Sequence, residues 1–217
     1  MIELVLKAGL SYLLGSVMGS LVIARLTGGA DIRTLGSGNA GATNALRTQG
    51  KKVGLAVLAI DLTKGWIATG VLAPWVLPSV IPSAAAPLAL WCAPLCGIAV
   101  MLGHVYPLWC GFRGGKGVAT LLGVVLGING WLLLPMMLTW LAAVIVFGYV
   151  GLASILAAVA LAVAIAVTSQ SAPRIAFGIV SVLLILYTHR TNIARMRTGT
   201  ESRARRLWLF GTRRGSA

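Results

Sequence analysis

Long apolar stretches, each close to the length of a membrane span, follow one another along the chain and alternate with short glycine-rich or basic segments. The stretch 151–168, for example, contains no charged residue. A helix needs about 20 apolar residues to cross the hydrocarbon core of a bilayer. The pattern predicts an all-α, polytopic membrane protein with seven transmembrane helices, at about 4–26, 53–73, 88–108, 117–133, 134–148, 151–168 and 174–189.

The number of spans depends on residues 117–148, where two predicted spans adjoin near Trp131 and Pro135. Seven spans with the N-terminus outside put 15 of the 18 basic residues on the cytoplasmic side. Fusing the adjoining spans leaves six and moves the Arg-rich C-terminus to the side opposite the first loop. Cytoplasmic loops carry the excess of Lys and Arg, so seven spans and a cytoplasmic C-terminus are favoured.

The first apolar stretch is too long for the core of a secretory signal peptide, and its positive charges follow it. We therefore expect an uncleaved first span. Small residues four apart in this span, Gly15 with Gly19 and Ser16 with Ser20, predict close packing against a neighbouring helix. We interpret residues 1–200 as a single membrane-embedded domain and residues 201–217 as a basic cytoplasmic tail.

Composition agrees with a chain that faces lipid over most of its surface. It is 58% hydrophobic and only 10% charged, against roughly 25% charged residues in soluble domains. The net charge of +14 indicates anionic partners. Nucleic acid is an unlikely class of partner because the basic residues lie between apolar runs, which leaves lipid headgroups and phosphorylated substrates. The three cysteines (Cys92, Cys96, Cys110) lack metal-site spacing, so we expect no metal and no cofactor.

The first predicted cytoplasmic loop is dense in glycine and short polar side chains, with the sequence GSGNAGATN over residues 36–44. Glycine lets backbone amides approach a ligand closely, and successive amides can form an anion-binding concavity. Thr43 and Arg47 are four residues apart, so they share a helix face, and Arg47 suits a phosphate clamp. The alternative is a flexible turn with a helix cap. The candidate site residues here are Gly36, Ser37, Gly38, Asn39, Thr43, Asn44 and Arg47.

The second predicted loop, GFRGGKGVAT over residues 111–120, runs into a predicted helix. A glycine-rich turn at a helix N-terminus directs free N–H groups and a positive dipole at an anion. A Walker A motif is excluded because Cys110 and Gly117 occupy the positions of its first Gly and its Ser or Thr. Membrane-surface anchoring by two cations is the alternative. The candidate residues are Arg113, Gly114, Gly115, Lys116 and Gly117.

The last predicted span ends in the sequence YTHRTN, in which His189 and Asn192 are three residues apart and share a helix face. A histidine there can hydrogen-bond a substrate or accept a proton near neutral pH. An amphipathic anchor at the membrane surface is the alternative. Asp61 and Lys64 lie near the middle of the second predicted span, and their spacing favours a structural ion pair.

Together, GSGNAGATN with Arg47, GHVYPLWCGFRGGKGVAT and HRTNIARMRTGTE resemble the motifs of the bacterial acylphosphate:glycerol-3-phosphate acyltransferase family. The resemblance extends from about Ser11 to Glu201. It implies a seven-span fold in the bacterial cytoplasmic (inner) membrane, with an active site that faces the cytoplasm. It also implies acyl transfer from acyl phosphate to the 1-hydroxyl of glycerol 3-phosphate, which yields lysophosphatidic acid and inorganic phosphate in the first step of phospholipid synthesis.

The same resemblance implies which residues act. Its functional positions fall on Ser37, Arg47, Lys116, His189 and Asn192, with Gly114, Gly115 and Gly117 as a phosphate loop and Glu201 as a structural carboxylate. The chain departs from the family at Met18-Gly19, where Pro-Phe is usual, and at Gly148 and Gly151, near which Arg and Ser are common. We expect the first departure to change helix packing and the second to change contacts with lipid or substrate.

For the reaction we expect direct attack of the substrate hydroxyl on the acyl carbonyl, because no Ser-His-Asp arrangement is evident. The base is either neutral His189 or a phosphate oxygen of a substrate. A coenzyme-A-dependent H-x-x-x-x-D acyltransferase is excluded, since Trp109 and Ala194 stand five residues after the two histidines. A phosphate transporter is a weaker alternative, because only Asp61 and Lys64 offer polarity at mid-depth.

Overall fold

The computed structural model describes residues 1–75, 86–169, 171–204 and 207–209, and within these ranges it is helical without any strand. Most of the predicted basic tail, 205–206 and 210–217, lies outside the described residues. The helices are α1 (Ile2–Gly15), α2 (Gly19–Thr27), η1 (Ile32–Thr34), α3 (Ala42–Thr48), α4 (Lys51–Trp66), η2 (Ile67–Leu72), α5 (Ala86–Ala89), α6 (Cys92–Val105), η3 (Leu108–Cys110), α7 (Val118–Asn129), η4 (Gly130–Leu132), α8 (Leu133–Phe147), α9 (Val150–Thr168), α10 (Ala172–Thr188) and α11 (Arg190–Arg197).

Length and composition would let four of the described helical segments cross a membrane, and up to six if two bent pairs each count as one span. The four are Lys51–Leu72, Pro87–Cys110, Val118–Phe147 and Val150–Thr168. The first expected span consists of two helices, α1 and α2, which meet at 44° after a break that follows Gly15. The last span also bends, by 54° between α10 and α11, at His189.

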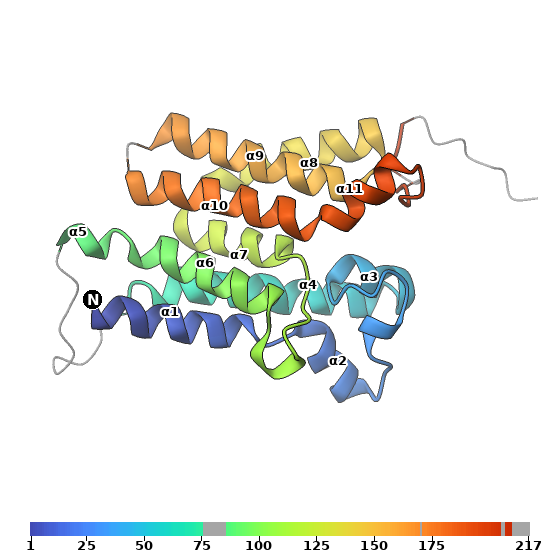
Figure 1. The fold of residues 1–217 in the computed structure, drawn as a ribbon, viewed down its shortest axis with the longest axis horizontal. Coiled ribbons are helices and arrows are strands. Elements are labelled where there is room, and N and C mark those ends of the chain that lie inside the picture. Colours follow the sequence, from blue (N-terminus) through green and yellow to red (C-terminus); the bar gives the residue numbers. More distant parts are fainter. Residues whose placement is uncertain (76–85, 170, 205–206, 210–217) are drawn as a thin grey trace, which may run out of the picture.

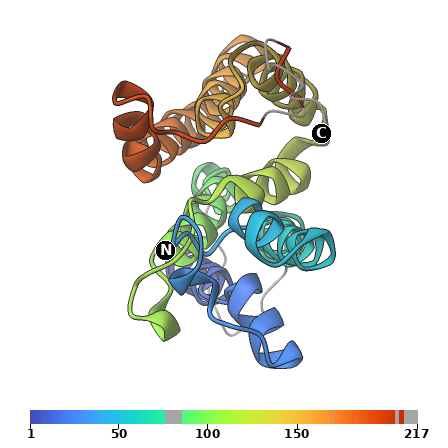
Figure 2. The ribbon, with the colours of Figure 1, turned by 90° about the vertical axis from the view of Figure 1, so that its right-hand side faces the viewer.

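The helices form two groups that α7 joins (Figures 1 and 2). Helices α8, α9 and α10 lie together on one side, and α1, α4 and α6 lie on the other. The largest hydrophobic core fills the space between α6, α7, α9 and α10, where side chains such as Val100, Leu121, Leu161 and Ile185 are completely buried. Although most of the chain is apolar, the protein thus has a buried hydrophobic core that is distinct from the apolar side chains on its outer surface.

Helices α1 and α6 approach each other closely through glycine. A Cβ on Gly15 would lie 2.2 Å from the carbonyl oxygen of Val100, and a Cβ on Gly103 would lie 2.1 Å from that of Tyr12. Only glycine fits such crossings without moving a backbone. The packing predicted for the small residues of the first span is confirmed at Gly15, and Gly19 adds a looser contact with Ile60 of α4.

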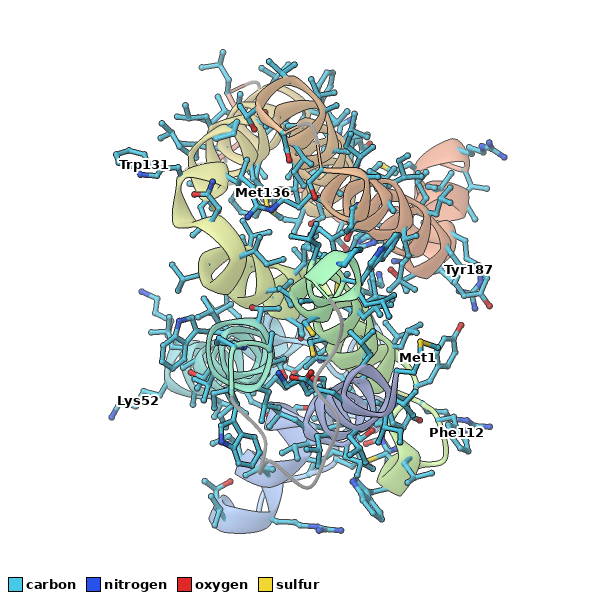
Figure 3. All side chains as sticks on the ribbon, turned by 90° about the vertical axis from the view of Figure 1, so that its left-hand side faces the viewer. Met1, Lys52, Phe112, Trp131, Met136 and Tyr187 are labelled. Atoms are coloured by element: carbon cyan, nitrogen blue, oxygen red, sulfur yellow. The ribbon has the colours of Figure 1, made fainter. Side chains whose placement is uncertain are left out.

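The segment 118–147 leaves one end of the bundle and returns to it. It begins beside Lys116, which contacts Asn192, and it ends at Gly148, close to Gly151, which also packs against Asn192. The turn between α7 and α8 is the short helix η4, whose Trp131 projects outward while Met136, one turn later, points inward (Figure 3). We call the end that carries α3, α11 and residues 111–117 the site end; Met1 and α5 lie at the opposite end (Figure 1).

Candidate functional site

The three motifs, distant in sequence, meet in a single cavity of about 390 Å³ at the site end. Figure 2 faces this end of the molecule and shows the ribbons of α3, of residues 111–117 and of α11. All five residues proposed to be catalytic line the cavity: Ser37, Arg47, Lys116, His189 and Asn192. Asn39, Thr43, Asn44 and Gly117 line it as well.

Asn44 holds the first glycine loop in shape from within. Its side-chain N–H groups lie 2.9–3.2 Å from the carbonyl oxygens of Ile32, Leu35 and Asn39, while its Oδ1 accepts the N–H of Ser37 at 3.1 Å. The side chain is 4% exposed. The side-chain hydrogen bonds of Asn44 are therefore made with the loop itself, and direct binding of substrate by Asn44 stays a prediction.

Arg47 is the cation that this loop leaves free. It lies on α3, four residues after Thr43, and both side chains border the cavity as their spacing predicted. Within the described part of the chain, Arg47 makes no hydrogen bond and no ion pair. An unengaged guanidinium at a cavity wall is available to bind a phosphate group through two parallel hydrogen bonds.

The second glycine turn is fixed by the end of α6 and by α10. The N–H groups of Gly114 and Gly115 donate to the carbonyl oxygens of Val105 and His104, both at 3.1 Å. Thr188 Oγ1 donates to the carbonyl oxygen of Lys116 at 3.1 Å. Gly117, with φ +84°, is the residue from which α7 begins, so the first N–H groups of α7 open beside Lys116.

A chain of polar contacts orients Lys116. Its ammonium donates to Asn192 Oδ1, and Asn192 Nδ2 donates to Glu201 Oε1 at 2.6 Å. The other oxygen of Glu201 pairs with Arg195 Nε at 2.6 Å. These contacts place Glu201 where it can fix the direction of the Asn192 amide; the structural role that the resemblance implies for Glu201 stays a prediction.

The ammonium of Lys116 lies in an environment that disfavours its charge. The pKa of Lys116 is lowered to about 8, mainly by burial and next by the positive charge of Arg195. The negative charge of Glu201 opposes this change, and the positive charge of Arg47 adds to it. A lysine with such a pKa still carries its charge at neutral pH. It also gains more from a phosphate than a fully solvated lysine does, because the anion restores the missing compensation.

His189 stands at the junction of α10 and α11 and is 3% exposed. Its Nδ1 lies 2.9 Å from the carbonyl oxygen of Ile185, which can only accept a hydrogen bond. Nδ1 therefore carries the hydrogen, and in the neutral ring Nε2 is the acceptor. This tautomer suits either a hydrogen bond from a substrate hydroxyl or removal of its proton.

The cavity continues from these polar groups to an apolar wall. This wall comes from α4, α7 and α8, and its members include Leu55, Leu58, Leu122, Met136, Met137 and Trp140. Asp61 and His104 border the same cavity from inside the bundle. The predicted ion pair is present, with Lys64 Nζ 2.9 Å from Asp61 Oδ1. One part of the cavity thus carries cationic side chains, and another part is an apolar surface that can accommodate a hydrocarbon chain.

A second, more open cavity of about 330 Å³ adjoins the first through Ser37, Asn39, Lys116 and Arg195. Gly38, Gly114 and Gly115 line this second cavity rather than the first. Two of the predicted binding residues, Gly36 and Arg113, line neither, and Arg113 is exposed. A contact between Arg113 and the substrate stays a prediction.

Two residues of the site were not among the sequence candidates. Arg195 follows Asn192 by three residues, a spacing that places both on one helix face, and this signal was available in the sequence. His104 lies in the second motif, but only the packed structure brings it to the cavity wall. Gly151 matters for packing, because its missing Cβ lets Asn192 approach, where a Cβ would lie 2.9 Å from the side chain.

Within the described ranges no three His, Cys, Asp or Glu residues gather as metal ligands would.

Known proteins are similar to this chain in sequence and in fold. A glycerol-3-phosphate acyltransferase family model matches residues 5–199. The glycerol-3-phosphate acyltransferase of Geotalea daltonii is 40% identical to the chain, over 92% of this chain and 96% of its own length. That of Aquifex aeolicus is 41% identical, over 89% of this chain and 95% of its own length. The crystal structure of PlsY, an integral membrane glycerol 3-phosphate acyltransferase, in its glycerol 3-phosphate form matches with a TM-score of 0.81 at 38% identity, over 92% of this chain and 94% of that one. Its lysophosphatidic acid form matches with a TM-score of 0.79. The chain belongs to the glycerol-3-phosphate acyltransferase family.

Proposed function

We propose that the protein transfers an acyl group from acyl phosphate to the 1-hydroxyl of glycerol 3-phosphate and releases lysophosphatidic acid and inorganic phosphate. This would be the first acylation in phospholipid synthesis. Its family and the glycerol 3-phosphate form of the related PlsY support the acceptor. The acyl phosphate donor is an inference from the motifs and from the chemistry of the cavity.

The observation that carries the proposal is the joining of two unlike surfaces in one cavity. Arg47 and Lys116 offer positive charge, and Leu58, Met136 and Trp140 offer an apolar wall. An acyl phosphate has the same two parts, a hydrocarbon chain and a phosphate group. Positioning and charge neutralisation are then the main contributions of the protein to the rate.

In the proposed step the hydroxyl oxygen of glycerol 3-phosphate forms a bond to the acyl carbonyl carbon. The bond from that carbon to the phosphate oxygen breaks, and inorganic phosphate leaves with the electron pair. The hydroxyl proton passes either to His189 Nε2 or to a phosphate oxygen. Lys116 and Arg47 neutralise the charge that collects on the departing phosphate.

Direct attack, without an acyl-enzyme, agrees with the nucleophiles that the site offers. The hydroxyl of Ser37 borders the cavity, but within the described residues no histidine or carboxylate accepts a hydrogen bond from it. A serine needs such a base to become a good nucleophile. Cys92 and Cys96 are buried, and neither they nor Cys110 line the cavity. Intact-mass measurement during turnover should show no acylated protein.

We also propose seven spans, an outside N-terminus and a site that faces the cytoplasm of a bacterial inner membrane. The return of 118–147 to the site end supports counting α7 and α8 as two short spans. Lys51 and Lys52 begin α4 directly after α3, which lies at the site end, whereas Lys7 belongs to α1 and Arg174 to the first turn of α10, which begin toward the other end (Figure 1). Residues 1–200 act as one domain, with 201–217 as its basic tail. Labelling of single cysteines introduced at Ser169 and Gly199 should give opposite accessibility in intact cells.

The test of the reaction is a comparison of acyl donors. Purified protein in detergent or nanodiscs would receive labelled glycerol 3-phosphate with acyl phosphate, acyl-coenzyme A or no donor. Formation of lysophosphatidic acid from acyl phosphate alone is the expected result. His189→Ala in the same assay tests the base, since full turnover by this variant would assign the proton to phosphate. Product from acyl-coenzyme A, or phosphate uptake into proteoliposomes without any product, would contradict the proposal.

A further inference from the structure

Three ionisable side chains that the proposed reaction does not use lie together inside the bundle. Asp61 and Lys64 belong to α4 and His104 to α6, and their exposed fractions are 0%, 3% and 2%. Ionisable groups at such depth in a membrane protein are expensive and generally have a function. This group also touches the site, because Asp61 and His104 border the main cavity.

Lys64 accounts for the structural part of this group. Its ammonium lies 3.0 Å from the carbonyl oxygen of Gly15, 2.8 Å from that of Val17 and 2.9 Å from Asp61 Oδ1. The ammonium thus donates to two backbone carbonyl oxygens and forms an ion pair with Asp61. The carbonyl groups belong to the break between α1 and α2, so Lys64 ties that break to α4.

Asp61 and His104 continue the connection toward the glycine turn. His104 Nδ1 lies 3.5 Å from Asp61 Oδ1. The opposite edge of the imidazole faces Gly115, where an added Cβ would lie 2.2 Å from Nε2. The carbonyl oxygen of His104 accepts the N–H of Gly115 at 3.1 Å. The imidazole therefore fills the space between a buried carboxylate and the residue that precedes Lys116.

We propose that Asp61 and His104 are a positioning pair for the second glycine turn: Asp61 sets the imidazole, and the imidazole sets the depth at which Lys116 enters the cavity. Neither residue touches the substrate in this role. The inference rests on the proposed function, because its main readout is acyl transfer. It identifies a reason for the turn to carry glycine at position 115, since any side chain there would displace the histidine.

The ionisation of Lys116 reports the depth of the turn. Four charged or titratable groups face the Lys116 ammonium. They are Arg47 on α3, His189 at the end of α10, Arg195 on α11 and Glu201, which follows α11. Asp61 and His104 lie on the other side of the turn. Burial is the largest cause of the lowered pKa of Lys116. Movement of the turn toward water would therefore raise this pKa and shift the alkaline limb of the activity profile to higher pH.

The test uses a pair of changes that should compensate each other. His104→Asn keeps an amide near the position of Nδ1 but removes the ring atoms over Gly115, and Gly115→Ala places a methyl group where those atoms were. Each single change should lower kcat roughly ten- to a hundredfold, as expected for a small misplacement of a site group. The double variant should regain most of that loss. Asp61→Leu with Lys64→Met removes both charges together, which avoids an unpaired buried charge, and should lower kcat like His104→Asn.

Each variant is purified, its folded fraction and thermal midpoint are measured, and kcat is given per folded molecule with a pH profile. Recovery in the double variant and an upward shift of the alkaline limb in His104→Asn are the expected results. Single variants with wild-type kcat and pH profile would overturn the inference, and so would a double variant as poor as the two losses combined. An inactive wild-type protein would instead contradict the proposed function.

Discussion

The two glycine-rich segments of the site present their cations in different ways. The first loop is held mainly by Asn44, whose side-chain partners all lie between Ile32 and Asn39, and by one hydrogen bond from outside, in which Ser20 Oγ of α2 donates to the carbonyl oxygen of Ala40 at 2.8 Å. The second turn is held from outside, by the end of α6 and by Thr188 of α10. Arg47 of the first is unengaged within the described residues, whereas Lys116 of the second is bound to Asn192.

The difference indicates a division of labour. An arginine side chain without a fixed partner can adjust to the position of a bound phosphate. A turn fixed by two helices keeps its lysine at one point in the cavity. We infer that Lys116 defines where the reacting phosphate lies and that Arg47 adapts to it.

The largest effect should follow loss of the fixed cation. Lys116→Met removes the positive charge while keeping most of the side-chain volume, and we expect kcat to fall roughly 10²–10³-fold, as for loss of one preorganised electrostatic contact. Lys52→Met is the matched control, because Lys52 is exposed at the start of α4 and lines neither cavity. Equal losses in the two variants would show that general charge, not position, is what matters.

A smaller loss of activity should follow removal of the Asn44 side chain from the first loop. Asn44→Ala leaves several backbone groups of the loop without their partner, at a cost of about 1–3 kcal/mol for each one that stays buried. We expect a higher KM for glycerol 3-phosphate and a lower thermal midpoint. Gln49→Ala is the control, since Gln49 bonds a single carbonyl, that of Ala30, at the exposed edge of the same loop. An unchanged KM in Asn44→Ala would contradict the internal scaffold.

The pH dependence separates the two cations. A lysine with a pKa of about 8 loses its proton as pH rises through that value, so the protonated form needed for phosphate binding declines above it. We expect kcat/KM to fall by up to about tenfold per pH unit above pH 8. In Lys116→Arg, whose guanidinium stays charged, the residual activity should lack this fall. An alkaline limb that survives in Lys116→Arg would assign it to another group.

The smallest effect should come from the hydrogen bond between α10 and the second turn. Thr188→Val removes the donor to the Lys116 carbonyl, which is worth about 0.5–1.5 kcal/mol, so kcat should fall roughly two- to tenfold. Thr188→Ser keeps the hydroxyl and should stay near wild type. Equal kcat values for Thr188→Val and Thr188→Ser would show that this hydrogen bond does not help to position Lys116.

The convergence of the motifs was predictable because the topology expected from the sequence puts all three on one side of the membrane. The pairing of Asp61 with Lys64 was predictable from their spacing alone. The contacts of Lys116 were not predictable, since Thr188 and Asn192 are more than 70 residues away and meet it only through the packing of α10 and α11. The role of Asn44 escaped notice because an amide in a glycine loop serves a ligand or its own backbone equally well.

The most direct test of the central claim, that both segments act on one bound phosphate, is a double-mutant cycle in kcat/KM. Arg47→Lys and Lys116→Arg keep charge but change geometry, and they would be measured singly and together with acyl phosphate and glycerol 3-phosphate. If both cations contact one reacting centre, the effects should couple by about 0.5–3 kcal/mol. Additivity within about 0.5 kcal/mol would mean that the two segments act independently, and would contradict a single shared site.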